Sequence, residues 1–222
     1  MLPENVKHAP EPSVRRLPIY LRHLKLLQTR GREVVSCTHI ASDLGLTNTQ
    51  VRKDLAATGI VGKPKVGYQV PELIDAIEGF LGWDNASDAF LVGAGHLGSA
   101  LLGYQGFADS GLNILAAFDA DPAKIGTTIH GREVFPIEKL YDLRDRMHVH
   151  IGVLAVPGPA AQEAANQMVL YGIRAIWNFT PARLDVPDSV IVENVSLLSS
   201  LAVLTNRLRE ALRAEHTQQQ ES

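Results

Sequence analysis

The sequence has a single cysteine, Cys37, among its 222 residues, and it contains no long hydrophobic run. One cysteine cannot form an intramolecular disulfide, so we expect a reducing compartment. The N-terminus carries prolines and charges but lacks the apolar core of a secretory signal. No apolar stretch approaches the length that crosses a bilayer. These absences predict a soluble, cytoplasmic protein with no membrane partner.

Catalytic groups are also scarce where they would be needed. The segments 156–158 and 178–181, which follow apolar runs, contain no His, Lys or Cys. His148 and His150 flank the start of a predicted strand, whereas ligands of an open α/β sheet bind at the strand ends. His96 lies within a glycine-rich turn, and His39 lies in a basic segment. No metal-ligand cluster and no Ser/His/Asp spacing is recognisable, so we predict a protein without catalysis and without a metal.

Charge is unevenly distributed although the net charge is only −3. Between Val14 and Val70, ten Lys and Arg residues stand against three acids, which is a balance of +7 and leaves about −10 for the rest. A basic N-terminal segment followed by an acidic remainder predicts that the N-terminal part binds a polyanion.

The most informative stretch is 89–98, where four apolar residues run into Gly93-Ala-Gly-His-Leu-Gly98. An apolar-periodic segment follows it (Leu97, Ala100, Leu101, Tyr104). Strand, tight turn and helix in this order are the context of a dinucleotide fingerprint. The first glycine permits the turn, Gly95 lets the backbone approach a pyrophosphate, and Gly98 lets the helix lie close to the strand.

An acid at the expected spacing supports this interpretation. The second apolar run, 114–118, ends at Asp119, where a carboxylate would bind the adenosine ribose hydroxyls and favour NAD over NADP. The alternative is a glycine-rich turn that binds nothing, which the strand, the helix and the spaced acid make the weaker interpretation.

The basic segment is predicted to be a helix-turn-helix. After an arm at 1–12, Leu17, Leu21, Leu24 and Leu27 recur at helical spacing, with Pro18 awkward unless the helix starts just before it. Ser36 precedes a short helix over 38–44 with Ile40, Ala41 and Leu44 inward, and Gly45 ends it. Thr47 with Gln50 forms a capping-box pattern for a second helix, which runs to about residue 58 with Val51 and Leu55 buried. Two short helices around a tight turn define this motif.

The second helix would be the recognition helix, and the segment 60–70 reads as a hairpin with Gly62, Pro64 and Gly67 at its turns. Such a hairpin is a wing, and its lysines could reach phosphates or a minor groove. The residues that we predict to contact DNA are Thr47, Asn48, Thr49, Gln50, Arg52, Lys53, Lys63, Lys65 and Tyr68. The alternative, a small helical domain with a solvated basic face, stays open on sequence alone.

The remaining chain alternates strand and helix signals, which indicates a doubly wound parallel sheet covered on both faces. Helices are expected from Pro71, at 136–145 and at 160–170, and strands at 132–135, 149–156, 173–177 and 190–192. In the last helix, leucines recur at spacings of four, three, four and four residues (Leu197, Leu201, Leu204, Leu208, Leu212). This seam either closes over its own domain or docks on a second subunit.

Several motifs together resemble the Rex family of redox-sensing repressors. They are Gln50-Val-Arg-Lys-Asp-Leu55, Gly67-Tyr68, Gly93-Ala-Gly-His-Leu-Gly-Ser-Ala-Leu101, Phe118-Asp-Ala-Asp-Pro122 and Asn178-Phe-Thr-Pro181. The resemblance covers roughly residues 13–213. It implies a homodimer with a winged-helix domain, a Rossmann domain and a C-terminal helix swapped between subunits. It also implies repression at an inverted-repeat operator when NADH is scarce, and release of the DNA when NADH binds.

Family roles carry over where residues match. Arg22 matches the helix-1 arginine of the family's switch, Tyr104 matches the tyrosine at the nicotinamide pocket, and Arg52 and Lys53 match the recognition helix. Two positions depart from the family pattern. The wing tip has Gly62-Lys-Pro-Lys65 in place of an arginine-containing turn, which passes minor-groove contact to a lysine. Ser196 stands where an aspartate commonly opens the last helix, which leaves open whether a charged switch pair exists.

Fingerprint and resemblance together give the predicted sites. The cofactor, NADH or NAD⁺, is expected at Gly93, Ala94, Gly95, His96, Leu97, Gly98, Tyr104, Asp119, Lys124, Val156, Pro157, Asn178 and Phe179. The switch residues are Arg22, Tyr104 and Ser196. The predicted domains are a disordered arm at 1–12, a winged-helix domain at 13–81, a Rossmann domain at 88–194 and a dimerisation helix at 195–215. The alternatives are an NAD-dependent oxidoreductase with an accessory N-terminal domain and a CoA-binding domain.

Overall fold

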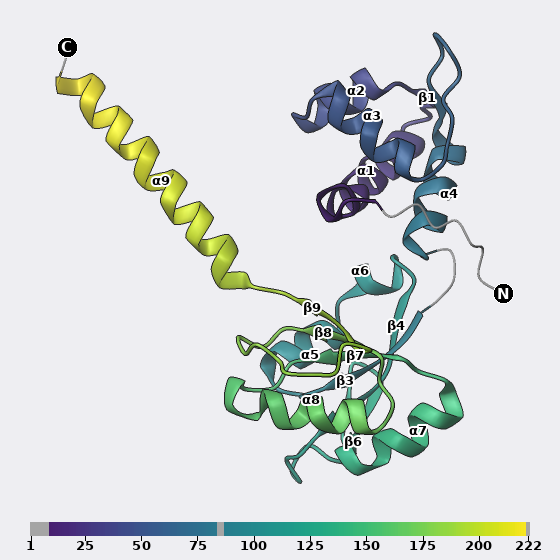
Figure 1. The fold of residues 1–222 in the computed structure, drawn as a ribbon, viewed down its shortest axis with the longest axis vertical. Coiled ribbons are helices and arrows are strands. Elements are labelled where there is room, and N and C mark those ends of the chain that lie inside the picture. The colour runs from purple at the N-terminus through teal and green to yellow at the C-terminus, as the bar shows by residue number, and fades with distance from the viewer. Residues whose placement is uncertain (1–8, 84–86, 221–222) are drawn as a thin grey trace. The chain divides into compact units, whose positions relative to one another are not determined.

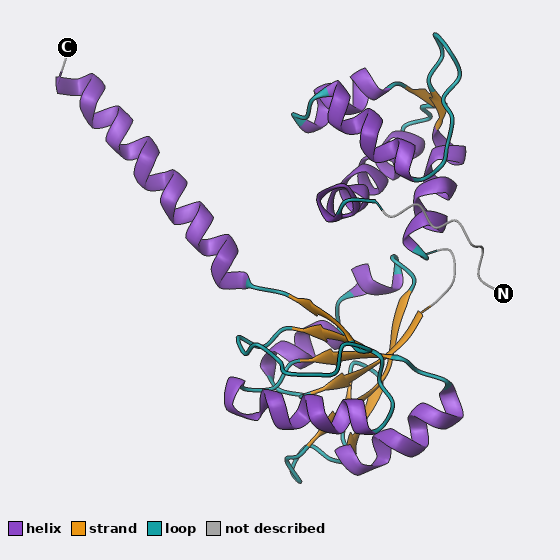
Figure 2. Ribbon diagram, viewed as in Figure 1, coloured by secondary structure: helices purple, strands orange, loops and turns teal. Residues whose placement is uncertain are grey.

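The computed structural model describes residues 9–83 and 87–220 and divides into two compact units, Met1–Ala86 and Ser87–Ser222 (Figure 1). The first unit is mainly helical, whereas the second alternates strands with helices (Figure 2). Within the described part, no helix combines the length and apolar character that a membrane span requires.

The first unit packs four helices beside a two-stranded antiparallel sheet. The helices are α1 (Glu11–Thr29), α2 (Cys37–Leu44), α3 (Asn48–Ala57) and α4 (Val70–Leu81), and the strands are β1 (Val34–Val35) and β2 (Tyr68–Gln69). The predicted inward positions are confirmed, since Ile40, Val51 and Leu55 are fully buried, Ala41 is nearly so, and Leu44 is partly buried against the same core. Leu17, Leu21, Leu24 and Leu27 line the same core from α1.

Helix α1 begins earlier than predicted and tolerates its proline. Glu11 and Pro12, assigned to a disordered arm, form its first turn, and the rest of that arm up to residue 8 lies outside the described residues. Proline is compatible with the first turn because the amide there has no helical partner. Pro18 sits inside the helix, where it removes one backbone bond. Burial of Leu17 and Leu21 on either side outweighs that loss.

The predicted hairpin over 60–70 is wrong in its pairing. Strand β2 pairs with β1, which precedes the helix-turn-helix, through the partners Val34–Gln69 and Val35–Tyr68. Within the segment itself a single bridge joins Lys63 to Gly67 and closes a tight loop. Gly67 has φ +103°, and an added Cβ would collide with the Val35 carbonyl oxygen. The close approach of β1 therefore sets the base of the wing, and a two-residue strand gives too little pattern to predict it.

The second unit is a seven-stranded sheet in the order β5-β6-β4-β3-β7-β8-β9, parallel except for β5. Its strands are β3 (Ser87–Val92), β4 (Leu112–Asp119), β5 (Thr128–Ile129), β6 (Arg132–Pro136), β7 (Ile151–Leu154), β8 (Ala175–Asn178) and β9 (Ile191–Asn194). Its helices are α5 (His96–Leu102), α6 (Gln105–Ala108), α7 (Leu140–Met147), α8 (Ala161–Leu170) and α9 (Leu197–Gln220), with 3-10 turns η1 (Ile137–Lys139) and η2 (Gly158–Ala160).

Alternate residues of β3 face two separate cores, which confirms the doubly wound prediction. Phe90 and Val92 pack with Leu140 of α7 and with α8, whereas Ala89 and Leu91 pack with residues of α5 and α6. The six parallel strands follow the Rossmann order, in which the chain leaves β3 toward one edge and later returns to β7 on its other side.

Element boundaries differ from the predictions at several points. The fingerprint helix ends at Leu102, so Tyr104 precedes α6 and does not lie on α5. Strand β7 is shorter than the apolar run at 149–156, and β8 begins two residues later than predicted. The segment 136–145 opens as a 3-10 turn before α7. Strands β1 and β5 and helix α6 were not predicted, because two to four residues carry no measurable period.

Helix α9 keeps its leucine seam exposed. The exposed fractions along the seam run from 47 % at Leu212 to 68 % at Leu197, and every side chain described in the helix is exposed. Ser196 caps the first turn, since its Oγ accepts a hydrogen bond from the Ser199 amide at 3.1 Å. In this chain the seam does not close over its own domain.

Candidate functional site

A cavity of about 660 Å³ opens at the carboxyl ends of β3 and β7. The two strands are neighbours, but their following connections leave in opposite directions, which defines the topological switch point where ligands of such sheets bind. Of the predicted cofactor residues, those that line the cavity are Gly93, Gly95, Asp119, Lys124, Val156 and Pro157.

Each fingerprint glycine is required for a different geometric reason. Gly93 has φ +100°, and an added Cβ would lie 2.7 Å from the Ala155 carbonyl. An added Cβ at Gly98 would collide with the Gly93 oxygen and approach Leu91, so the helix could not lie this close to the strand. Gly95 has open space where its Cβ would be. The turn is thus closed on the protein side and open on the cavity side, as the approach of a pyrophosphate requires.

Asp119 lies at the end of β4 with its carboxylate already held in place. Oδ2 accepts hydrogen bonds from the Ala94 amide at 2.8 Å and from Lys124 Nζ at 3.0 Å, and Oδ1 accepts one from the Asp121 amide at 2.9 Å. Burial alone would raise the pKa of Asp119, but these bonds outweigh it and lower the pKa. The group is therefore ionised at neutral pH and can accept bonds from ribose hydroxyls.

Sequence reasoning missed the far wall of the cavity. Glu138 follows β6, and Glu163 and Gln167 come from one face of α8. The signal was present, because Ala160, Glu163, Ala164 and Gln167 recur at helical spacing, and the two polar members interrupt an otherwise apolar face.

The other predicted cofactor residues lie elsewhere. Ala94 contributes its amide to Asp119, and His96 begins α5. Tyr104 is 60 % exposed and packs edge-on against Phe107, which contacts Trp177, which in turn contacts Phe179. This aromatic row does not line the fingerprint cavity. Asn178 is fully buried and donates to the Ala182 carbonyl and to Asn194.

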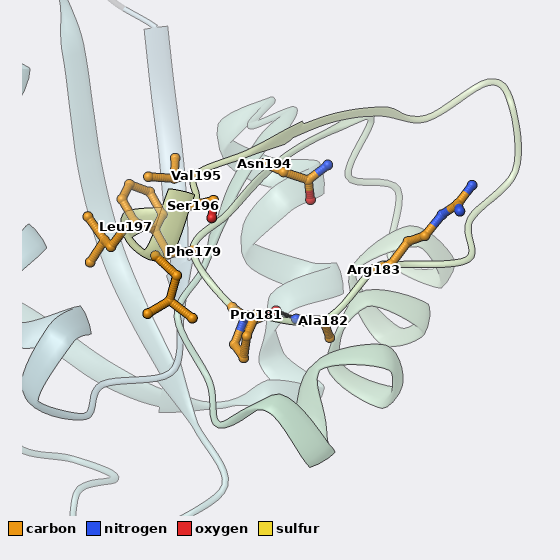
Figure 3. Close-up of a pocket in the computed structure, with 10 residues that line it drawn as sticks. Phe179, Pro181, Ala182, Arg183, Asn194, Val195, Ser196 and Leu197 are labelled. Carbon is orange, nitrogen blue, oxygen red and sulfur yellow. Dashed lines mark hydrogen bonds between the residues drawn. The ribbon is translucent and has the colours of Figure 1, made fainter. Parts of the chain in front are cut away.

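The aromatic row ends at a second cavity of about 450 Å³, lined by 179–183 and 194–198. Figure 3 shows Phe179, Val195 and Leu197 gathered at one end of it, whereas Arg183 extends away. Ser196 lines the same cavity. The row of rings that begins at Tyr104 thus ends at Phe179, which lines the same cavity as Ser196. Arg22 is exposed on α1 of the other unit.

In the first unit α3, the predicted recognition helix, is capped at its start. Thr47 Oγ1 accepts a hydrogen bond from the Gln50 amide at 3.2 Å, and Gln50 Oε1 accepts one from the Thr47 amide at 3.1 Å. The predicted capping box is confirmed. Asn48 donates to Thr38 Oγ1 on α2 at 2.7 Å. Thr47, Asn48 and Gln50 therefore shape the helix-turn-helix, and Thr49, Arg52 and Lys53 are exposed on the helix.

A buried ion pair fastens this helix to α1. Arg16 makes a bidentate contact to Asp54, with Nε–Oδ2 at 2.6 Å and Nη2–Oδ1 at 2.8 Å, and the Tyr20 hydroxyl donates to Oδ2 at 2.6 Å. Asp54 is 1 % exposed. Burial would raise the pKa of Asp54, but the bonds from Arg16 and Tyr20 lower it. This cluster could not be predicted from the sequence, because Asp54 has the pattern of any polar residue on an exposed helix.

A groove of about 460 Å³ separates α3 from the wing. Arg52 lines it from the helix, and Lys63 and Lys65 line it from the loop. Tyr68 also lines it, and the Tyr68 ring lies 2.9 Å from the position that a Cβ at Gly62 would take. Three exposed cations around one groove suit a phosphate backbone.

A winged helix-turn-helix and a Rossmann unit in one chain define a DNA-binding regulator that responds to a nucleotide. Two family descriptions match, "Putative DNA-binding protein N-terminus" over residues 8–56 and "CoA binding domain" over residues 84–182. The redox-sensing transcriptional repressor Rex of Treponema denticola is 53 % identical over 87 % of this chain and 92 % of its own, and that of Bacteroides fragilis is 46 % identical over 90 % of each.

Solved structures agree with the sequence relatives. The Rex-family repressor RSP superposes with a TM-score of 0.85 at 35 % identity, covering 96 % of this chain and 99 % of its own. Its complex with β-NAD⁺ and operator DNA gives 0.86 at 36 % identity, over 96 % and 98 %. The chain belongs to the Rex family of redox-sensing transcriptional repressors.

Proposed function

We propose that this protein represses transcription by binding an inverted-repeat operator as a homodimer, and that NADH in the β3–β7 cavity releases the DNA. The observation that carries the proposal is the fingerprint turn, which is closed by Gly93 and Gly98 and open at Gly95, in the same chain as a capped recognition helix. RSP, which is 36 % identical over 96 % of this chain, has been solved with β-NAD⁺ and operator DNA, and also with β-NADH.

The residues of the cavity fit a dinucleotide. Backbone amides of 93–98 would hold the pyrophosphate, and the ionised Asp119 would accept the ribose hydroxyls. The cofactor's nicotinamide supplies the oxidised or reduced state that is sensed. Tyr104, the aromatic row and Ser196 would pass that state on, and Arg22 would receive it on α1. The nucleotide can shift the equilibrium only by contacting the two arrangements differently.

We infer further that the protein senses without catalysing. The relatives are named as transcriptional repressors, and the described residues that line the fingerprint cavity offer carboxylates and Lys124 but no His, Cys or Tyr. This distinguishes the proposal from an oxidoreductase, for which NADH would be consumed with a substrate. Because it acts on DNA and reads a metabolic nucleotide, we place it in the cytoplasm.

CoA is the second candidate, since residues 84–182 match a family described as a CoA binding domain. CoA carries a 3′-phosphate on its ribose, and Asp119, Asp121, Glu138 and Glu163 surround the cavity with a single cation, Lys124. That negative charge disfavours a phosphorylated ribose. Calorimetric titration of NADH and CoA into the same sample separates the two.

Replacing Arg52 or Lys53 with alanine is expected to weaken operator binding by about 5- to 150-fold, because each charged contact is worth about 1–3 kcal/mol. Fluorescence anisotropy with labelled operator measures this. Arg30→Ala removes an exposed charge of the same unit away from α3 and is the matched control. Unchanged affinity in both variants, with NADH binding retained, would mean that the recognition helix is misassigned.

Asp119→Ala is expected to weaken NADH binding by about 1–3 kcal/mol, since a charged acceptor is lost and the Ala94 amide and Lys124 lose their partner. Calorimetry gives the affinity. Glu133→Ala removes an exposed acid from β6 outside the cavity and should leave it unchanged. A wild-type protein that prefers NADPH to NADH would contradict the role of Asp119.

A further inference from the structure

Positive charge gathers at the amino ends of the strands, on the edge of the sheet opposite the fingerprint cavity. Arg144 projects from α7, His148 and His150 precede β7, and Arg174 precedes β8. An open pocket of about 370 Å³ lies there, with Arg144, Gly172, Arg174 and Ser189 among its lining residues. None of these residues lines the proposed nucleotide cavity or the groove beside α3 that we propose for DNA.

Arg144 is held in a fixed position. Its guanidinium lies against Gly172, where an added Cβ would come within 3.1 Å of Nε and 3.2 Å of Cζ. Nη2 lies 3.1 Å from His150 Nδ1. Nε is buried and has no hydrogen-bond partner among the described residues. A side chain that is only 18 % exposed therefore presents a guanidinium whose donors are incompletely satisfied.

The charge of this pocket is poorly compensated. Burial and the positive charges of Arg144, Arg174 and His148 lower the pKa of His150, which reports a positive local potential. Arg144 pairs with Asp145, whose Oδ1 lies 3.7 Å from Arg144 Nη1 and whose side chain is 70 % exposed. An exposed pair at that distance contributes little. Among the ion pairs of the described residues, none involves Arg174.

We propose that this pocket binds a phosphate group, either free or as the monoester of a small metabolite. Planar guanidinium groups recognise such oxyanions through paired donors. Arg144 forms the fixed wall, Arg174 closes over the anion from the exposed side, and the Ser189 hydroxyl supplies a further donor. The proposal does not rest on the redox function, because the pocket and the fingerprint cavity lie at opposite ends of β7.

Methyl NMR of the full-length protein tests this inference. Ile173 lines the phosphate pocket and Ile137 lines the fingerprint cavity, so the two δ1 methyl groups report the sites separately. Sodium phosphate and glycerol 3-phosphate are titrated at ionic strength fixed with sodium chloride. The same titrations are run on Arg174→Gln, whose side chain is exposed, and on Arg146→Gln, an equal loss of charge from α7 outside the pocket.

We expect the Ile173 methyl to shift saturably in the wild type and in Arg146→Gln, with at least about tenfold weaker binding in Arg174→Gln. The compound that saturates at the lower concentration identifies the source of the phosphate group. A shift confined to Ile137, or equal Ile173 affinity in Arg174→Gln and wild type, would overturn the proposal. The fingerprint cavity would remain assigned in either case.

Discussion

Asp54→Ala is expected to lower the free energy of unfolding by about 3 kcal/mol, because it leaves the partly buried guanidinium of Arg16 and the buried hydroxyl of Tyr20 without their acceptor. Asp54, which is 1 % exposed, accepts two hydrogen bonds from Arg16 and one from Tyr20, and these three residues form a clamp between α1 and α3. A loss of this size is a large part of the 5–15 kcal/mol that typically stabilises a domain. Urea denaturation of the full chain, followed by amide exchange in α1 and α3, measures it.

Two further variants separate charge burial from packing. Tyr20→Phe removes a single hydrogen bond and should cost about 1 kcal/mol. Arg16→Met combined with Asp54→Leu replaces the whole pair with apolar side chains and should restore much of the stability lost in Asp54→Ala. A loss below about 1 kcal/mol in Asp54→Ala, without compensating rearrangement, would show that the pair contributes nothing net.

The same three residues predict how the free energy of unfolding depends on pH in the acid range. Because the pKa of Asp54 is lowered in the folded protein, its contribution is fully present above its ordinary value of 3.8. The contribution is then lost as the pH falls through the lowered folded pKa. Toward low pH the wild type should therefore lose stability relative to the Arg16→Met, Asp54→Leu double variant, which has no carboxylate at position 54.

Charging the seam of α9 with Leu201→Glu and Leu204→Glu is expected to convert a dimer into monomers. The two leucines are 52 % and 64 % exposed in the single chain, so their apolar surface is available to a second subunit. Burying a leucine contributes roughly 1.5–3 kcal/mol, and two subunits bring four of them. Each 1.4 kcal/mol is a factor of about ten in association. Light scattering gives the mass.

Operator binding should fall together with the dimer, because two recognition helices reach successive half-sites only when they are joined. Ala202→Glu with Asn206→Glu places the same charges on the other side of α9 and is the matched control. A seam variant that stays dimeric would show that the dimer interface lies on another surface of the chain. A monomeric variant that keeps full operator affinity would separate DNA binding from dimerisation.

The long periodic helices and strands and the fingerprint motif could be predicted from the sequence. Contacts between residues far apart in the sequence could not. Gly93, Gly98 and Asp119 could be assigned because each role is local to a strand, a turn and a helix start. The β1–β2 pairing could not, since 33 residues separate Val35 from Tyr68 and each strand has two residues. The Arg16–Asp54 ion pair could not be predicted for the same reason, because no local sequence pattern connects α1 with α3.

The structure also gives individual residues roles that differ from the predicted ones. The apolar spacing predicts Tyr104 on the fingerprint helix. Gly103 ends that helix, and the Tyr104 ring packs against Phe107 instead. Thr47 and Gln50 were assigned to DNA from their chemistry, and the structure shows that their side chains also cap α3. Polar residues at a helix start serve both purposes, and only their partners distinguish the two.

Thr47 and Gln50 bond to each other, so the first turn of α3 is held by residues of the chain itself. No entropy of helix formation then has to be supplied during the encounter with DNA. Association should therefore proceed at a rate set by diffusion and by attraction between Arg52, Lys53 and the phosphates, and this rate should fall steeply as salt is added. Differences between operators should then appear in how long the complex lasts.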